Sequence, residues 1–188
     1  EKILTTTSDY TYNLTNLKLK SSRTTYPDNS VNEISYNYAS DKNNTYLITN
    51  NIIGVPLETV ATKKINAQDI GKTISKIETI YPLNQSEADT KTSGLPLPTE
   101  VKSTNLLNTI STEITYNQYD SKGNLQQYTT KDGIPTAIVW GYNQTQPIAK
   151  IVGATYAQVS SLAAAIISAS DLDASNPSNE AALITALD

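Results

Sequence analysis

Hydrophobic and polar residues alternate along most of the first 150 positions, which is the pattern of strands with one buried face. The alternation is clearest at Lys72–Tyr81, where apolar side chains recur between charged and hydroxyl residues. Polar clusters separate such segments, as at Pro27-Asp28-Asn29, where each residue type favours a tight turn. Further strands are predicted at Tyr10–Leu14, Leu17–Lys20, Val31–Tyr38, Leu57–Lys63 and Leu95–Lys102.

Two segments interrupt this pattern. Tyr46–Ile53 is a short apolar stretch with no clear period, and Gly54 breaks it. Leu83–Thr92 has almost no apolar content, and we expect it to be the most mobile part of the chain.

The most regular strand and turn pattern lies in Ile114–Asn143. Tyr119-Asp120 precedes Gly123-Asn124, a second turn follows at Gly133, and an apolar run ends in Trp140-Gly141-Tyr142. Glycine supplies positive φ angles at turns, and the Asp120 carboxylate can accept bonds from nearby backbone N–H groups. This stretch predicts three consecutive strands joined by two tight turns.

A helical pattern replaces the alternation after Gly153. Thr155–Ser170 is rich in alanine, carries an apolar stripe, and begins with a threonine suited to an N-cap. We expect a turn at Asp171–Asn176 and a second helix from Pro177 or Ser178. The predicted regions are therefore a β-hairpin sheet over 1–153 and a helical hairpin over 154–188. The second helix reads as truncated, and the chain has no Met, which favours a piece of a longer polypeptide.

Composition narrows the function classes. The chain has 12 Tyr, one Trp and no Phe, which favours thin sheets whose tyrosine hydroxyls are exposed to solvent. It has no Cys and no His, so disulfides, His-based catalysis and most zinc, copper or haem sites are excluded. The net charge is −4 without a basic stripe, which argues against nucleic-acid binding. No run approaches the roughly 18 apolar residues of a membrane span, so we expect no membrane insertion.

The sequence offers no catalytic, cofactor-binding or metal-ligating residues. Glu58 and Glu78 could be considered a glycosidase dyad, but their spacing gives no support and a solvated strand face is the simpler interpretation. Asp120 with Asn124, and Asp171 with Asp173, have oxygen ligands that suit calcium, yet both sets are better explained as turns. Trp140 and Tyr142 alternate onto one face and could form a carbohydrate platform, although a packing pair is favoured.

Repetition links three segments. Tyr10–Leu14, Ile34–Tyr38 and Ile114–Tyr119 each carry an apolar residue or Tyr, a Ser or Thr, then Tyr-Asn. Units of about 20 residues with this frame are typical of stacked hairpins. The set Tyr119, Asp120, Gly123 and Asn124, followed by Gly133 and the aromatics Trp140 and Tyr142, resembles the YD-repeat of bacterial Rhs-type proteins. The stretch from Asp132 to Ile151 is similar to the region just upstream of the last YD repeats in large secreted or cell-surface members.

The resemblance implies long β-sheets that coil into a hollow shell, sometimes around a C-terminal toxin. The expected fold is mainly β, with antiparallel YD-repeat-like hairpins in a curved sheet and a C-terminal helical hairpin. The expected function is a non-catalytic structural wall segment of a large secreted or surface bacterial protein. Its partner would be the remainder of its own polypeptide or a larger surface assembly. The alternative is an adhesin-like β binding module that contacts glycan or protein through exposed Tyr and Trp.

Overall fold

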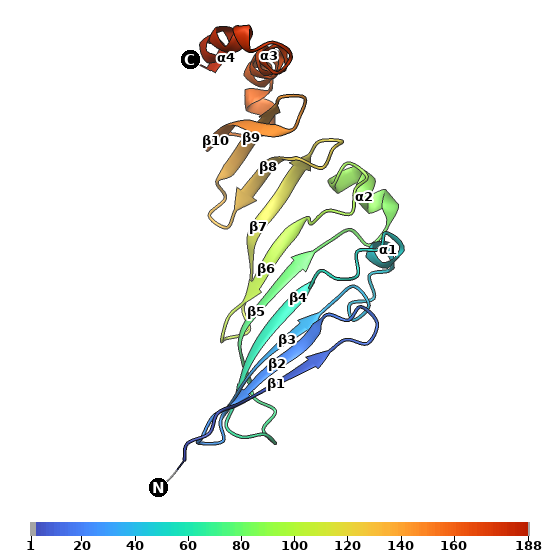
Figure 1. Cartoon of the computed structure of the whole chain (residues 1–188), viewed down its shortest axis with the longest axis vertical. Helices are drawn as coiled ribbons and strands as arrows, with labels where there is room; N and C mark the ends of the chain where they lie inside the picture. Colours follow the sequence, from blue (N-terminus) through green and yellow to red (C-terminus); the bar gives the residue numbers. More distant parts are fainter. Residues whose placement is uncertain (1–2, 188) are drawn as a thin grey trace. The chain divides into compact units, whose positions relative to one another are not determined.

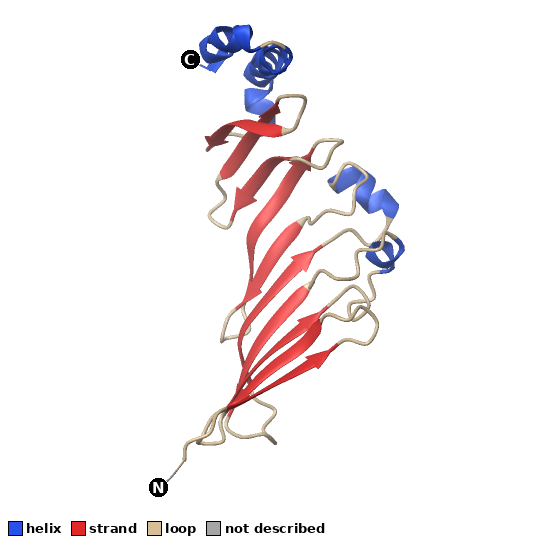
Figure 2. Cartoon of the chain, in the orientation of Figure 1, coloured by secondary structure: helices blue, strands red, loops and turns tan. Residues whose placement is uncertain are grey.

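The structure, a computed structural model, describes residues 3–187 and shows a mainly β fold (Figure 1). Ten strands form an open antiparallel sheet in the order in which they occur along the chain, and a helical hairpin follows them. Figure 2 shows how strands dominate and helices occupy the connections and the C-terminal part. The predicted fold class is confirmed, because each strand pairs with the next in sequence, as consecutive hairpins do.

The chain divides into two compact units. The first comprises residues 3–85 and 100–113, and the second comprises residues 86–99 and 114–187. The elements of the first unit are β1 (Thr7–Tyr12), β2 (Leu19–Thr25), β3 (Val31–Asn37), α1 (Thr45–Thr49), β4 (Glu58–Lys64), β5 (Lys72–Ile80) and β6 (Glu100–Thr104). The second unit holds α2 (Gln85–Lys91) except its first residue, the end of β7 (Ile110–Tyr119), β8 (Leu125–Thr130), β9 (Pro135–Gly141), β10 (Gln146–Val152), α3 (Tyr156–Ser175), a 3-10 turn (Pro177–Asn179) and α4 (Glu180–Leu187).

This division differs from the boundary at residue 153 that the sequence suggested. The helical hairpin belongs to the same unit as β8, β9 and β10, because α3 packs against β9. Ala137 and Val139 lie on the covered face of β9 and are buried. The buried residues of α3 are Ala163 and Ser170, whereas Leu162 is 68% exposed, so small side chains make the buried contact of this helix.

Pairing in the first unit is regular. β3 and β4 pair without interruption from Val31 opposite Lys64 to Asn37 opposite Glu58, and one bulge interrupts the β4–β5 pair. The predicted turn between β2 and β3 forms at 26–30, where the Asp28 carboxylate accepts the Ser30 N–H at 2.9 Å. Asn29 has a φ of 66°, a left-handed value that Asn tolerates well.

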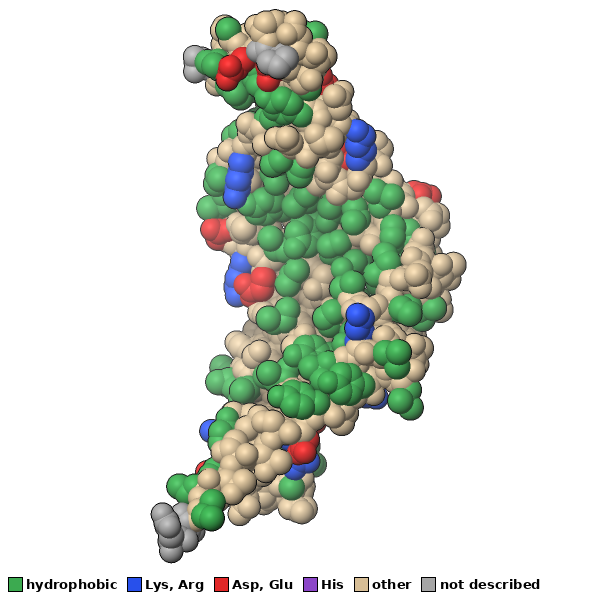
Figure 3. Space-filling model, viewed as in Figure 1, with side chains coloured by type: hydrophobic (Ala, Val, Ile, Leu, Met, Phe, Trp, Pro, Cys, Tyr) green, Lys and Arg blue, Asp and Glu red, His purple; other side chains and the backbone are tan. Residues whose placement is uncertain are grey.

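The core of the first unit is thin. Most of its buried apolar residues come from the connection between β3 and β4, and these are Tyr38, Ala39, Tyr46, Leu47 and Leu57. The strands themselves leave large side chains exposed, and Tyr10 on β1 is 59% exposed while Ile77 on β5 is 51% exposed. Figure 3 shows hydrophobic side chains spread over the visible face of the molecule. The tyrosine-rich composition thus predicted the thin sheet correctly.

Two short helices occupy segments in which the sequence predicted none. α1 lies in the apolar stretch near Tyr46, where the Asn44 side chain accepts the Leu47 N–H at 3.0 Å as an N-cap. α2 lies within Leu83–Thr92, so the expectation of a mobile segment is replaced by a helix. Ala88 of this helix is fully buried, and Glu87 pairs with Lys91 one turn later at 2.6 Å.

The C-terminal helices are longer and better capped than the composition alone showed. Thr155 caps α3 as predicted, in a reciprocal capping box with Gln158. α3 continues to Ser175, so Asp171 and Asp173 are helical and the predicted turn at 171–176 is corrected. Among residues 3–187, no helix is both long enough and apolar enough to cross a membrane.

Candidate functional site

The Asp120 turn between β7 and β8 is the most densely bonded part of the predicted motif. The Asp120 Oδ1 atom accepts N–H groups from Lys122 and Asn124, both at 2.9 Å, and Oδ2 accepts the Asn124 Nδ2 amide at 2.9 Å. Gly123 has a φ of 88°, a left-handed value that explains why glycine occupies this position. Asp120 is only 9% exposed. Its carboxylate therefore holds the turn together and has little room for a ligand.

Tyr119 fastens the turn to the segment before β6. Its hydroxyl donates to the Pro98 carbonyl at 2.8 Å, and its own carbonyl accepts the Ser93 hydroxyl at 2.7 Å. The ring is buried and lies 6.3 Å from the Tyr116 ring, between centroids. The ring is thus packed beside another ring while the hydroxyl is hydrogen-bonded, as a buried tyrosine requires. Tyr119 is a packing residue with both polar groups satisfied.

A strained turn joins β9 to β10. Tyr142, Asn143 and Gln144 have φ angles of 52°, 58° and 61°, so three consecutive residues with Cβ atoms lie in the left-handed region. This conformation costs roughly 1–2 kcal/mol per residue and needs support from its surroundings. The Asp120 turn supplies part of it, because Lys122 Nζ donates to the Asn143 carbonyl at 2.6 Å and Asn124 Nδ2 donates to the Gln144 carbonyl at 2.9 Å.

Helix α3 supplies the rest of the support. Ser170 Oγ accepts the Tyr142 N–H at 3.1 Å, and Asp171 Oδ1 accepts the Asn143 N–H at 2.7 Å. The Tyr142 hydroxyl donates to Asp173 at 2.9 Å, and this bond to a carboxylate raises the pKa of Tyr142. The sequence does not reveal these roles, because the bonded partners lie about 30 residues apart and no local signal connects them. Together the Asp120 turn, the 142–144 turn and the end of α3 form what we call the turn clamp.

The remaining motif residues take separate positions. Gly133 has a φ of 80° in the β8–β9 turn, at the opposite end of β8 from Asp120. Trp140 is half-buried on β9 and its Nε1 donates to the Leu125 carbonyl at 2.8 Å. Tyr142 lies beyond the last residue of β9, with a left-handed backbone. The expected placement of Trp140 and Tyr142 on one strand face is therefore wrong, and the two rings do not alternate along a strand.

The polar groups of the turn clamp are hydrogen-bonded to one another, so its carboxylates are not available as catalytic groups. The carboxylates of Asp120, Asp171 and Asp173 are each occupied by donors from neighbouring backbone or side chains. Within residues 3–187, no group of three or more acidic side chains is placed to hold a metal ion. Within the motif, the β7–β8 turn is therefore hydrogen-bonded to the β9–β10 turn, the next turn on the same side of the sheet.

A second cluster of charges lies in the first unit. Glu58 and Glu78 are directly opposite each other on β4 and β5, and two lysines neutralise them. Lys42 Nζ lies 3.2 Å from Glu58 and 2.6 Å from Glu78, while Lys76 Nζ lies 2.5 Å from Glu58. Glu58 also accepts the Asn37 amide at 2.7 Å. Glu58 is only 7% exposed, so the expected solvated strand face is corrected to a buried, paired carboxylate.

This cluster is also unsuited to acid–base catalysis near neutral pH. Burial alone would raise the pKa of Glu58, but hydrogen bonds from Lys76, Asn37 and Lys42 lower it to about 2. Burial opposes the charge of Lys42, yet its bonds to Glu78 and Glu58 raise its pKa. Both groups are therefore held in their charged forms, whereas a general acid or base needs a pKa near the working pH.

We expect the Glu58 cluster to make folding acid-sensitive. The pKa of Glu58 is depressed by folding, so its stabilisation is complete above about pH 4.5 and is lost as the pH falls toward 2. The loss should amount to at most about 3 kcal/mol. Urea unfolding of the chain and of Glu58→Gln from pH 6 to pH 2.5 measures this loss, because the difference in unfolding free energy between the two should shrink on acidification.

The control is Glu87→Gln, which removes a surface ion pair on α2 and should leave the pH profile unchanged. A constant difference across this range would contradict the assignment.

Comparison with known proteins adds no identification: no family model matches the chain, and no curated protein matches it.

Proposed function

We propose that the chain is a non-catalytic structural segment, part of the wall of a large secreted or cell-surface bacterial protein of the Rhs/YD-repeat kind. The observation that carries the proposal is the order of the sheet, in which all ten described strands pair with their neighbours in sequence. A wall needs such a surface, extended by one hairpin after another, and it needs little thickness. The thin core and exposed strand faces of the first unit agree with that use.

The motif that resembles a YD repeat supports the same function. Its Tyr-Asp pair and its glycine close a hairpin turn, and Lys122 and Asn124 from that turn then hold the next turn on the same side. A repeat unit that stabilises its successor is useful in a sheet built by repetition. The Glu58 cluster and the turn clamp are satisfied internally, which suits a structural part better than an enzyme.

Detection of the native polypeptide tests the proposal. An antibody raised against this chain should recognise, in the producing bacterium, a polypeptide much larger than the 20.4 kDa of the chain itself. The protein should appear in the medium or on the cell surface, where protease added to intact cells degrades it. A 20 kDa species that stays inside the cells and resists added protease would refute the proposal.

A further inference from the structure

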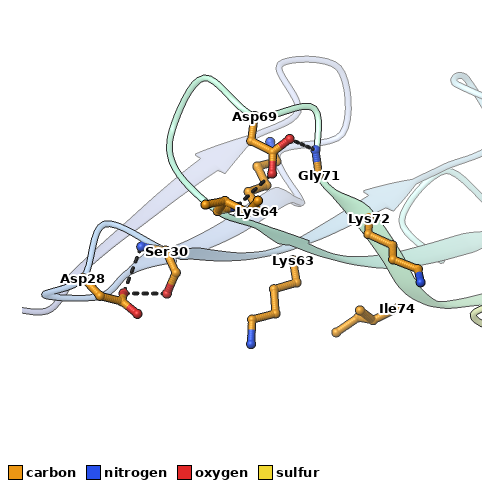
Figure 4. Close-up of a pocket in the computed structure, with 9 residues that line it drawn as sticks. Asp28, Ser30, Lys63, Lys64, Asp69, Gly71, Lys72 and Ile74 are labelled. Carbon is orange, nitrogen blue, oxygen red and sulfur yellow. Dashed lines mark hydrogen bonds between the residues drawn. The ribbon is translucent and has the colours of Figure 1, made fainter.

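A groove in the first unit has the size of a small-ligand site. It lies where β4 and β5 join the loop at 65–71, and its volume is about 660 Å³ (Figure 4). Small-molecule sites in proteins commonly span roughly 300–1,000 Å³. Lys63, Lys72 and Ile74 extend from the same side of the ribbon into this region.

Two lysines of the groove lack partners. Lys63 and Lys72 are directly opposite each other in the β4–β5 register and both are exposed. Within residues 3–187, neither ammonium group has a hydrogen bond or an ion pair. The pKa of the nearby Asp28 carboxyl is lowered chiefly by its hydrogen bonds from Ser30, and the charge of Lys63 acts in the same direction. Like charges directly opposite each other destabilise a sheet, so this pair is unfavourable without an anion.

The other lysines of this part of the sheet contrast with the pair. Lys64 lies 2.5 Å from Glu33, Lys102 lies 3.0 Å from Glu100, and Lys76 belongs to the Glu58 cluster. Those lysines therefore form ion pairs with carboxylates, whereas among residues 3–187 Lys63 and Lys72 form none.

The carboxylates at the groove are already occupied. Asp69 accepts backbone N–H groups from Ile65 at 2.8 Å and from Gly71 at 3.1 Å, and these bonds lower its pKa. Asp28 accepts the hydroxyl of Ser30 at 2.6 Å and its N–H at 2.9 Å. Both aspartates close their own loops (Figure 4), and neither forms an ion pair with Lys63 or Lys72.

We propose that this groove binds an anionic ligand that carries a carboxylate, sulfate or phosphate group on a ring-sized body. The anionic oxygens bind the ammonium groups of Lys63 and Lys72, and the body of the ligand contacts Ile74, which is 40% exposed between them. Charge-assisted bonds of this kind are the strong polar contacts of a shallow site. The inference is independent of the wall function, because a structural segment at a cell surface can still carry a ligand site.

Calorimetric titration of the chain with three probes tests the site. Glucuronate combines a carboxylate with a sugar ring, inorganic phosphate offers the anion alone, and glucose offers the ring alone. Glucuronate should bind, phosphate should bind more weakly, and glucose should not bind. Ile74→Ser should weaken glucuronate and leave phosphate unchanged. Equal binding of glucose and glucuronate, or no binding of either anion at millimolar concentration, overturns the proposal.

Lysine variants give the decisive comparison. K63Q/K72Q should weaken glucuronate by about tenfold or more, because it removes both charge-assisted contacts. K18Q/K20Q removes the same net charge from exposed lysines at β2 and should bind as the unchanged chain does. Equal losses in the two double variants would show a general charge effect and no site.

A ligand-free measurement separates binding from folding. K72Q should raise the melting temperature by about 1–3 °C without ligand, because it relieves the repulsion across β4 and β5. A lysine that served the fold would lower the melting temperature when replaced. A lower melting temperature for K72Q, with circular dichroism otherwise native, would therefore contradict the proposal.

Discussion

Replacing Asp120 by alanine should destabilise the second unit by about 2–4 kcal/mol. The variant leaves the N–H groups of Lys122 and Asn124 without their acceptor in a part-buried turn. It also frees the Asn124 amide, whose second bond supports the Gln144 carbonyl in the left-handed turn. The loss therefore reaches beyond one hairpin, since the 142–144 turn depends on this support.

Thermal unfolding followed by circular dichroism measures the effect. The melting temperature of Asp120→Ala should fall by roughly 5–15 °C. Asp120→Asn keeps one acceptor oxygen and should lose about half as much. The matched control is Asp132→Ala in the β8–β9 turn, where the carboxylate also accepts bonds from Thr130 and the Ile134 backbone but is exposed to solvent and, among residues 3–187, supports no second turn. If Asp132→Ala costs as much as Asp120→Ala, the turn clamp does not depend on the Asp120 carboxylate.

The local part of this site was predictable from sequence, and the distant part was not. Asp120, Gly123 and Asn124 interact within four residues, so turn chemistry alone describes them. The bonds from Asn124 to Gln144 and from Ser170 to Tyr142 span 20 and 28 residues. These bonds depend on which strand ends lie beside α3 in the fold. Neither the alternation of residues nor their types predicts that arrangement.

The strands and the missed helices show the same limit. Alternation predicted the bounds of β5 within one residue, but it did not predict its burial, because Ile74 and Ile77 are exposed while Lys76 and Glu78 join the Glu58 cluster. α2 has one buried residue, Ala88, in seven, so it gives no helical period, and contact with neighbouring segments decides its conformation. Glu58 and Glu78 appeared solvated because the sequence does not show that Lys42 and Lys76 converge on them.

Gly141→Ala should be as damaging as the loss of Asp120, for a steric reason. A Cβ atom on Gly141 would overlap Ser170 Oγ and would lie 2.6 Å from Ile148 Cδ1 and 2.9 Å from Ser170 Cβ. The Ser170 Cβ atom is fixed to the backbone of α3, so the helix must move away from β9 to admit it. Overpacking of this kind costs about 1–3 kcal/mol, and displacement of the Tyr142 N–H bond to Ser170 adds about 1 kcal/mol.

A second substitution distinguishes this clash from a general glycine effect. Ser170→Gly alone should destabilise, because it removes the acceptor of the Tyr142 N–H and places glycine in a helix. In the Gly141→Ala/Ser170→Gly chain the two losses should be less than additive, since the clashing Ser170 side chain is gone and only the end of the Ile148 side chain must still move. Gly54→Ala is the control, because its Cβ would meet only the flexible Lys18 side chain, at 3.0 Å, and it should cost little. Denaturant unfolding of the unchanged chain, the two single variants and the double variant gives the coupling energy. Strict additivity would show that α3 does not pack on β9 through Gly141. Close contact at this glycine is what allows Asp171 and Asp173 to reach the strained turn, so the helix, the glycine and the turn should be lost together.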